Sequence, residues 1–105
     1  MKFMVTIKTK DSFGELPEET RAKLHAGSFD IIDKHIKAGK IKGYYLDMSS
    51  EEVVSIWDVE SDEELCKLVF NSPIVPYTHI QVSSILEYEI GNALTRQVFW
   101  ALTFN

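Results

Sequence analysis

Two histidines are the residues of this sequence best suited to moving a proton near neutral pH. His25 lies midway along a predicted helix, and His79 lies at the start of the last predicted strand. An imidazole whose pKa is close to ~6.5 can both accept and donate a proton in this range. His25 and His79 are therefore the candidate catalytic residues. The alternatives are that His25 is a packing residue of the helix and that His79 is a solvated residue at the end of a strand.

Polar and aromatic side chains on the predicted strands could line a small-molecule pocket. A lysine could neutralise an acidic ligand, hydroxyl and amide groups could hold its oxygens, and an indole could supply an apolar wall. The candidates for substrate binding are Lys8, Tyr45, Ser55, Trp57, Gln81 and Ser83. Tyr44 and Tyr45 are adjacent, so one of the two rings faces inward, and the sequence leaves open which. A dimer interface with satisfied polar groups would use the same residues.

The sequence predicts neither a metal site nor a cofactor site. The three histidines are dispersed, without the spacing of a metal-binding pair. The acidic run at 60–64 fits the first turn of a helix, where carboxylates complement the helix dipole. The sequence contains no Gly-rich phosphate loop and no nucleophile elbow.

Hydrophobic periodicity predicts six elements that must position these side chains. Residues 2–9 alternate between apolar and polar, which is typical of a strand with one dry face. Ser61 and Glu64 form a capping box, which predicts the start of a helix. Strands are expected at 2–9, 41–48, 53–59 and 78–89, with helices at 17–38 and from 62 onward. The order β-α-β-β-α-β predicts an α+β, ferredoxin-like fold whose antiparallel sheet carries both helices on one face.

The longer predicted helix has one apolar stripe that we expect to face the sheet. The stripe consists of Ala22, His25, Ala26, Phe29, Ile32 and Ile36. A second row, Leu24, Ile31 and Ala38, lies nearly opposite. It indicates either a contact with another subunit or scattered exposed apolar residues.

The other face of the predicted sheet is too apolar for bare water and too polar for a dry core. Strand alternation assigns to it a set of polar side chains with one indole: Ser55, Trp57, His79, Gln81 and Ser83. We therefore expect two such faces to meet in a homodimer and to enclose a pocket between the protomers.

The end of the chain carries an apolar cluster: Val98, Phe99, Trp100, Leu102 and Phe104. Such a cluster is costly to expose to water. We expect residues 1–90 to form the domain, and residues 91–105 to form a C-terminal extension that packs on its own subunit or on a neighbour.

Composition and charge disfavour several classes of function. The 105 residues carry a formal net charge of -5, whereas nucleic acids and anionic membranes both require a positive patch. No apolar run is long enough to span a bilayer. The single cysteine, Cys66, cannot form an internal disulfide, which fits a reducing compartment. We expect a cytoplasmic protein that binds neither nucleic acid nor a membrane.

A distinctive pattern runs from the third predicted strand to the last one. It is a hydrophobic-Asp-Val-Glu-Ser unit at 57–61, a short Glu-Leu helix, and a Pro-hydrophobic-hydrophobic-Pro-Tyr turn at 73–77. Together with Gly39-Lys40, this pattern resembles the muconolactone isomerase family. The resemblance covers most of residues 1–88.

This resemblance implies a ferredoxin-like protomer that pairs into a dimeric α/β barrel and can build a larger ring. It also implies isomerisation of an unsaturated lactone by a proton shift between two carbons, without metal or organic cofactor. Such a reaction needs a base near the acidic carbon and donors at the developing enolate. The chain departs from the family pattern at Gly27 and Ser28, where members carry a charged Arg-Glu pair.

Three functions are compatible with these observations. The first is a muconolactone isomerase-like enzyme that acts on a small unsaturated lactone or acidic metabolite, with proton transfer by His25 or His79. The second is a non-catalytic small-molecule-binding or assembly protein of the same fold. The third, by fold analogy, is a cofactor-free monooxygenase-like enzyme. The expected partners are a second copy of the chain, as a homodimer or larger ring, and a small-molecule ligand.

Overall fold

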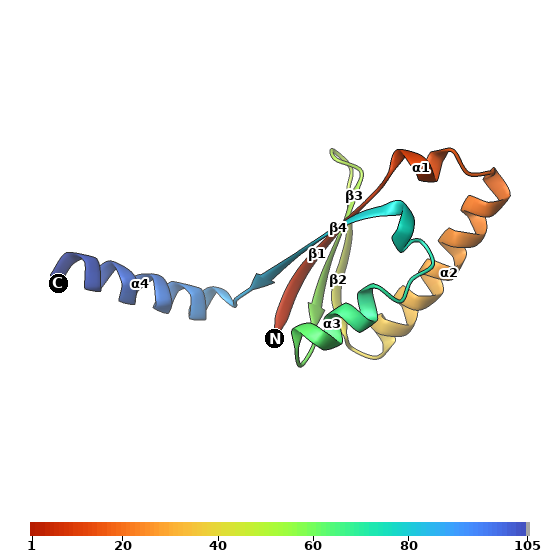
Figure 1. Cartoon of the computed structure of the whole chain (residues 1–105). Helices are drawn as coiled ribbons and strands as arrows, with labels where there is room; N and C mark the ends of the chain where they lie inside the picture. Colours follow the sequence, from red (N-terminus) through yellow and green to blue (C-terminus); the bar gives the residue numbers. More distant parts are fainter. Residues whose placement is uncertain (105) are drawn as a thin grey trace.

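Four strands and five helical segments make up the fold within residues 1–104 (Figure 1). The computed structural model describes the backbone of residues 1–104 and the side chains of residues 1–98. In chain order the elements are β1 (Lys2–Thr9), α1 (Asp11–Gly14), α2 (Glu18–Lys37), β2 (Ile41–Asp47), β3 (Glu52–Asp58), α3 (Asp62–Val69), the 3-10 turn η1 (Val75–Tyr77), β4 (Thr78–Ile85) and α4 (Tyr88–Phe104).

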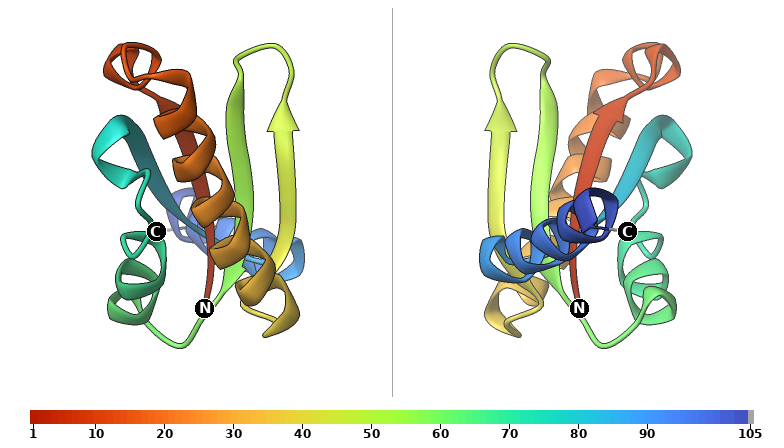
Figure 2. Two further views of the ribbon diagram at one scale, coloured as in Figure 1. Left: turned by 90° about the vertical axis from the view of Figure 1, so that its right-hand side faces the viewer. Right: turned by 90° about the vertical axis from the view of Figure 1, so that its left-hand side faces the viewer.

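The strands form one antiparallel sheet in the order β2-β3-β1-β4. Figure 2 shows α2 and α3 on one face of this sheet and α4 on the side of the other face. The predicted α+β class and the β-α-β-β-α-β order are confirmed. We call the face under α2 and α3 the covered face, and the opposite one the open face.

The core lies between the covered face and the two helices, as the alternation of β1 predicts. Phe3 and Val5 are 4% and 0% exposed. Phe3 pairs with Trp57 of β3 in the sheet register, and Leu65 of α3 is buried in the same cluster. Burying an apolar side chain such as Phe3, Val5 or Leu65 stabilises the fold by roughly 1.5–3 kcal/mol. The residues between them, such as Met4, point to the open face.

The rotation of α2 differs from the prediction. His35 is buried at 8% exposure, and Ile32 packs against the core. Phe29 and Ile36 of the predicted stripe are instead 53% and 44% exposed, while Leu24 from the opposite row is half-buried. Because apolar residues occur on several sides of this helix, the helical wheel defines no single dry face, and packing on the sheet selects one.

The predicted capping box starts α3. The Ser61 Oγ accepts a hydrogen bond from the Glu64 N–H at 3.1 Å, and the Glu64 carboxylate accepts one from the Glu60 N–H at 2.8 Å. The Lys40 ammonium lies 2.6 Å from the Glu64 carboxylate. Their hydrogen bond holds the pKa of Glu64 below its ordinary value. These contacts tie the start of α3 to the end of the α2–β2 connection.

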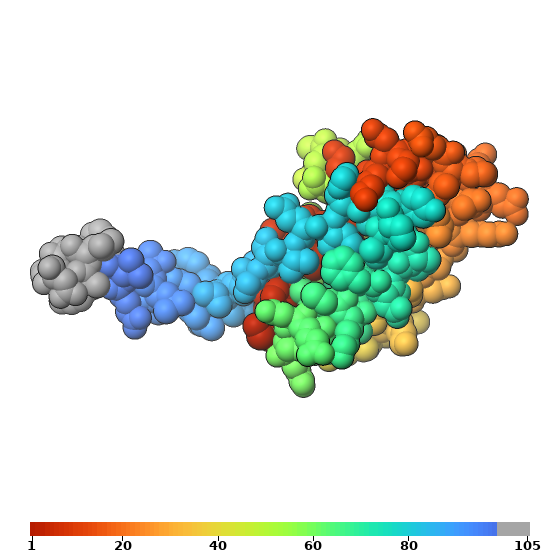
Figure 3. Space-filling model, in the orientation of Figure 1, coloured from red at the N-terminus to blue at the C-terminus, as the bar shows by residue number. Residues whose placement is uncertain are grey.

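The last strand is shorter than predicted, since β4 ends at Ile85 and a helix begins at Tyr88. Leu86, which falls within the predicted strand at 78–89, lies outside the observed strand and is 59% exposed. Helix α4 projects from the body (Figures 1 and 3), and the whole molecule measures 62 × 29 × 23 Å. Glu87 forms an ion pair with Lys2 at the base of α4.

Part of the predicted C-terminal apolar cluster can be located. Val98 is 60% exposed on α4, and the side chains of Phe99, Trp100, Leu102 and Phe104 lie outside the described residues. Within the described part of the chain, no helix combines the length and the apolar character that a membrane crossing requires.

Candidate functional site

A pocket of ≈ 370 Å³ lies between α2 and the covered face. Phe13 of α1 and Glu51 of the β2–β3 turn are part of its lining, and these two elements lie at the same end of the molecule (Figure 1). Its apolar walls come from β1, α1, α2, β2, β3 and the segment before β4. The polar residues among its lining are Thr9, His25, Ser28, Tyr44, Glu51 and Thr78. Apolar walls with a few polar groups are typical of a small-molecule site.

His25 is held between two phenyl rings in this pocket. The ring of Phe13 meets the imidazole edge-on at a centroid distance of 5.0 Å. The ring of Phe29, one turn along α2, stacks on the imidazole at 5.8 Å. These aromatic contacts favour some orientations of the imidazole over others, while the His25 side chain as a whole remains exposed.

Gly27 and Ser28 let α2 approach the segment that leads into β4. A Cβ at Gly27 would lie 3.3 Å from the Pro73 Cγ, so this position has little room for a longer side chain. The hydroxyl groups of Ser72 and Ser28 form a hydrogen bond of 3.4 Å. The place at which the family pattern has a charged pair is therefore a close helix–loop contact in this chain.

Tyr44, not Tyr45, lies on the pocket side of β2. The register of β2 shifts between Ile41 and Gly43. This irregularity turns Tyr44 toward the helices and leaves Tyr45 on the open face, where it is 63% exposed. Burial raises the pKa of the Tyr44 hydroxyl, so this group stays a neutral hydrogen-bond donor. Simple alternation from Ile41 would have favoured Tyr45, because the sequence does not reveal the bulge.

The predicted placement of Ser55 and Trp57 is wrong. Both residues are buried on the covered face, at 2% and 6% exposure. The Trp57 indole N–H donates to the Ser55 Oγ at 2.9 Å, and the Ser55 hydroxyl donates to the Val5 carbonyl at 3.3 Å. Each buried polar group thereby has a partner, so the pair can belong to the core.

The open face carries the other predicted binding residues. His79, Gln81 and Ser83 point to this face, as expected from the alternation of β4. Lys8 pairs with His79 across the two strands, and a shallow hollow of ≈ 130 Å³ is lined by Lys8, His79 and Gln81 with Thr6, Glu52 and Ile80. The structure therefore separates the two candidate catalytic histidines, because His25 lies on the covered face and His79 on the open face.

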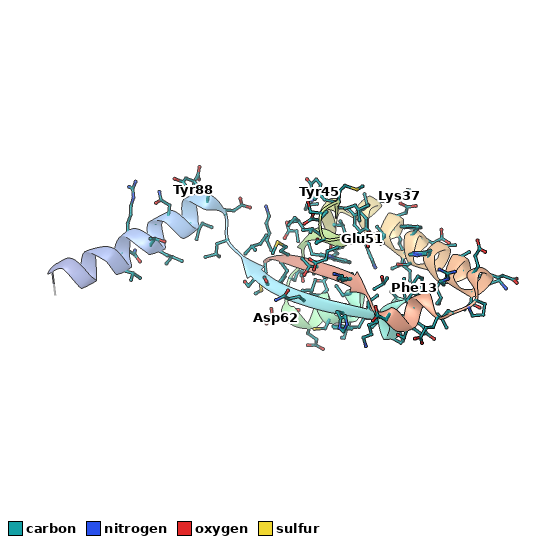
Figure 4. The ribbon with its side chains drawn as sticks, turned by 90° about the horizontal axis from the view of Figure 1, so that it is seen from above. Phe13, Lys37, Tyr45, Glu51, Asp62 and Tyr88 are labelled. Carbon is teal, nitrogen blue, oxygen red and sulfur yellow. The ribbon has the colours of Figure 1, made fainter. Side chains whose placement is uncertain are left out.

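A second hollow of ≈ 340 Å³ adjoins the pocket under α2. It is lined by the cationic residues Lys8 and Lys10 and by the acidic residue Asp11, and it shares Thr9, Phe13 and Glu51 with the pocket. Figure 4 labels Phe13 and Glu51 at this end of the molecule. Across residues 1–98, no three His, Cys, Asp or Glu side chains gather closely enough to hold a metal ion.

The order of elements and the sheet define a ferredoxin-like α+β protein with a pocket beneath its first long helix. Residues 1–89 match the family described as muconolactone delta-isomerase, and the chain belongs to this family. A crystal structure of muconolactone isomerase is similar, with a TM-score of 0.73 and 22% sequence identity over 84% of this chain and 91% of that chain. At this identity the likeness shows a shared fold. A comparison with curated proteins gives no match.

Proposed function

We propose that this protein isomerises a small unsaturated lactone or a similar acidic metabolite by cofactor-free proton transfer, in the pocket under α2. Membership of the muconolactone delta-isomerase family supports the reaction class. The observation that carries the choice of site is the ≈ 370 Å³ pocket in which an imidazole meets mostly apolar walls. The open-face hollow of ≈ 130 Å³ is too small to enclose such a substrate.

In this proposal each side chain has a defined task. His25 takes part in the proton transfer, and the hydroxyl groups of Ser28 and Tyr44 donate to the oxygen on which enolate charge develops. Lys8 and Lys10, which line the adjoining hollow together with Asp11, attract a carboxylate on the substrate. The apolar walls exclude water from the ring of the substrate.

The test compares the two histidines on opposite faces. Muconolactone is the probe, and isomerisation is followed for the wild type, His25→Gln and His79→Gln. We expect His25→Gln to lower kcat by about 100-fold or more, since a positioned proton-transfer group contributes on that order. His79→Gln should stay within about threefold of wild type, because it lies outside the pocket. The reverse result would move the site to the open face.

A non-catalytic binding protein is the second candidate, and the close contact at Gly27 favours it. The position of the family's charged pair has no ionisable side chain in this chain, and Pro73 fills the space beside it. This alternative predicts that muconolactone raises the melting temperature without turnover, as expected for a ligand that binds only the native state. Oxygen consumption during the same assay would instead support the monooxygenase-like alternative.

We also propose that two open faces meet in a homodimer. Met4, Val54, Ile56 and Ile85 form a half-buried aliphatic strip on this face, which is flanked by polar residues such as Gln81. This distribution is typical of an interface with an apolar centre and a polar rim. Residues 1–90 would then be the folding unit, and the rest of the chain would pack on the neighbour. The single cysteine supports a reducing, cytoplasmic location.

A further inference from the structure

The β2–β3 turn holds a glutamate in an unfavourable backbone conformation. Glu51 has φ 60 and is the one non-glycine residue with positive φ in the described chain. Its N–H donates to the Asp47 carbonyl at 2.8 Å, and the Asp47 carboxylate accepts from the Ser49 N–H at 2.9 Å. The turn thus fixes Glu51 in the left-handed region, which favours glycine or asparagine. Residues kept in this region against their preference often serve a site.

The strained residue Glu51 is also part of the pocket lining, where a carboxylate can act on a substrate. Glu51 lines both the pocket under α2 and the adjoining hollow that contains Lys8 and Lys10. Among the described residues that line the pocket, it is the one carboxylate, and His25 is the one imidazole. The two groups reach the same space from different elements, the turn and α2. Its neighbour Glu52 lines the small hollow of the open face instead.

We propose that Glu51 is the second proton-transfer residue of the pocket and acts together with His25. This inference rests on the proposed isomerase function. The Glu51 carboxylate takes the proton from the acidic carbon, and the electron pair of that C–H bond forms the enolate while the carbonyl oxygen takes the negative charge. The His25 imidazolium then gives a proton to the distal carbon, whose new C–H bond uses the electron pair of the former double bond. The proton on Glu51 passes to His25, which restores both groups.

The same carboxylate should weaken ground-state binding of an anionic substrate. The negative charge of Glu51 repels the substrate carboxylate in the bound ground state. The same charged carboxylate is needed as the base when the carbon loses its proton. Replacement of Glu51 by glutamine keeps the size of the side chain and removes both effects. We therefore expect Glu51→Gln to lower kcat while the affinity for the substrate stays equal or rises. A merely structural role of Glu51 would not produce this combination.

The experiment uses the full chain, with muconolactone as the probe and Glu51→Gln, Glu52→Gln and Glu51→Gly as variants. We expect Glu51→Gln to lower kcat by about 100-fold or more and to bind muconolactone as tightly as wild type or several-fold more tightly. Glu52→Gln should match wild type within about twofold. Glu51→Gly should lose activity similarly while its melting temperature equals or exceeds that of wild type, because glycine accepts the positive φ.

Two different failures are distinguishable. If wild type turns over muconolactone, His25→Gln is inactive and Glu51→Gln keeps kcat within about threefold, the role of Glu51 is overturned and the proposed function stands. If wild type itself shows no turnover above buffer, the proposed function and this inference fall together. A Glu51→Gly protein that is both active and more stable would also overturn the role.

Discussion

The two faces of the sheet are built from the same strands, yet they differ in what covers them. The covered face packs under α2 and α3 and leaves a pocket of ≈ 370 Å³ at one end. The open face carries a half-buried aliphatic strip and a hollow of ≈ 130 Å³. Neighbours such as Tyr44 and Tyr45, or Glu51 and Glu52, therefore meet different surroundings. The position of a residue in the strand alternation places its side chain either on the covered face, which has the pocket, or on the open face, which has the aliphatic strip.

The largest expected effect tests whether a second copy covers the open face. Ile56→Glu places a charge in the aliphatic strip, and an unpaired buried charge costs about 3–5 kcal/mol. We expect wild type to run as a dimer at micromolar concentration and Ile56→Glu as a monomer, as measured by light scattering after size exclusion.

Lys23→Glu, on the exposed side of α2, is the matched control and should leave the dimer intact. A wild-type protein that is monomeric at this concentration would show that the open face has no second copy upon it.

The next effect compares equal truncations on the two faces. Val5→Ala removes two methyl groups from a fully buried site, so it should lower the free energy of unfolding by about 2–3 kcal/mol. In the monomeric Ile56→Glu background, Val54→Ala removes the same groups from a site that is half-buried in the protomer and should cost about 1 kcal/mol. Urea denaturation measures both. Equal losses would mean that the open face is as tightly covered as the core.

Removal of residues 92–105 should affect assembly more than the stability of the body. Helix α4 projects from the sheet, and Val98 and Leu94 are 60% and 48% exposed. We expect the melting temperature of the truncated protein to fall by no more than about 4 °C, which corresponds to about 1 kcal/mol. Light scattering should report a smaller assembly. An unchanged assembly would contradict packing of the extension on a neighbour.

The smallest expected effect is a loss of stability at acidic pH that is caused by His35, which lies on α2 against the covered face. Burial against Trp57 lowers the pKa of His35 below 6.5, and the positive charge of Lys34 adds to the shift. Just below about pH 6.5, His35 is therefore protonated in the unfolded chain but still neutral in the native state. Stability is lost as the pH falls through the native pKa. His35→Gln should show a weaker loss than wild type in urea denaturation between about pH 7.5 and pH 5.5.

The features read correctly from the sequence are those that local physics controls. The alternation of Phe3 and Val5 with polar neighbours defined β1, and the Ser61 capping box defined the start of α3. His25 was singled out because a histidine midway along an amphipathic helix stands out by its chemistry, and the structure places it in the lining of the pocket, whereas its part in catalysis stays a prediction. The sequence did not single out Glu51, because a glutamate in a turn gives no signal until its backbone angle and its place in the pocket lining are known.

The sequence by itself determined the order of elements, the family and the split between a dry and a wetter side of β1, because these depend on periodicity over short distances. Tertiary structure alone decided the rotation of α2, the facing of β3 and the choice between Tyr44 and Tyr45. Apolar residues occur on both faces of β3, and the Trp57 indole N–H donates to the Ser55 hydroxyl. The sequence of β3 alone therefore does not determine which of its two faces is buried. The contacts with β1 and α2 selected one of them.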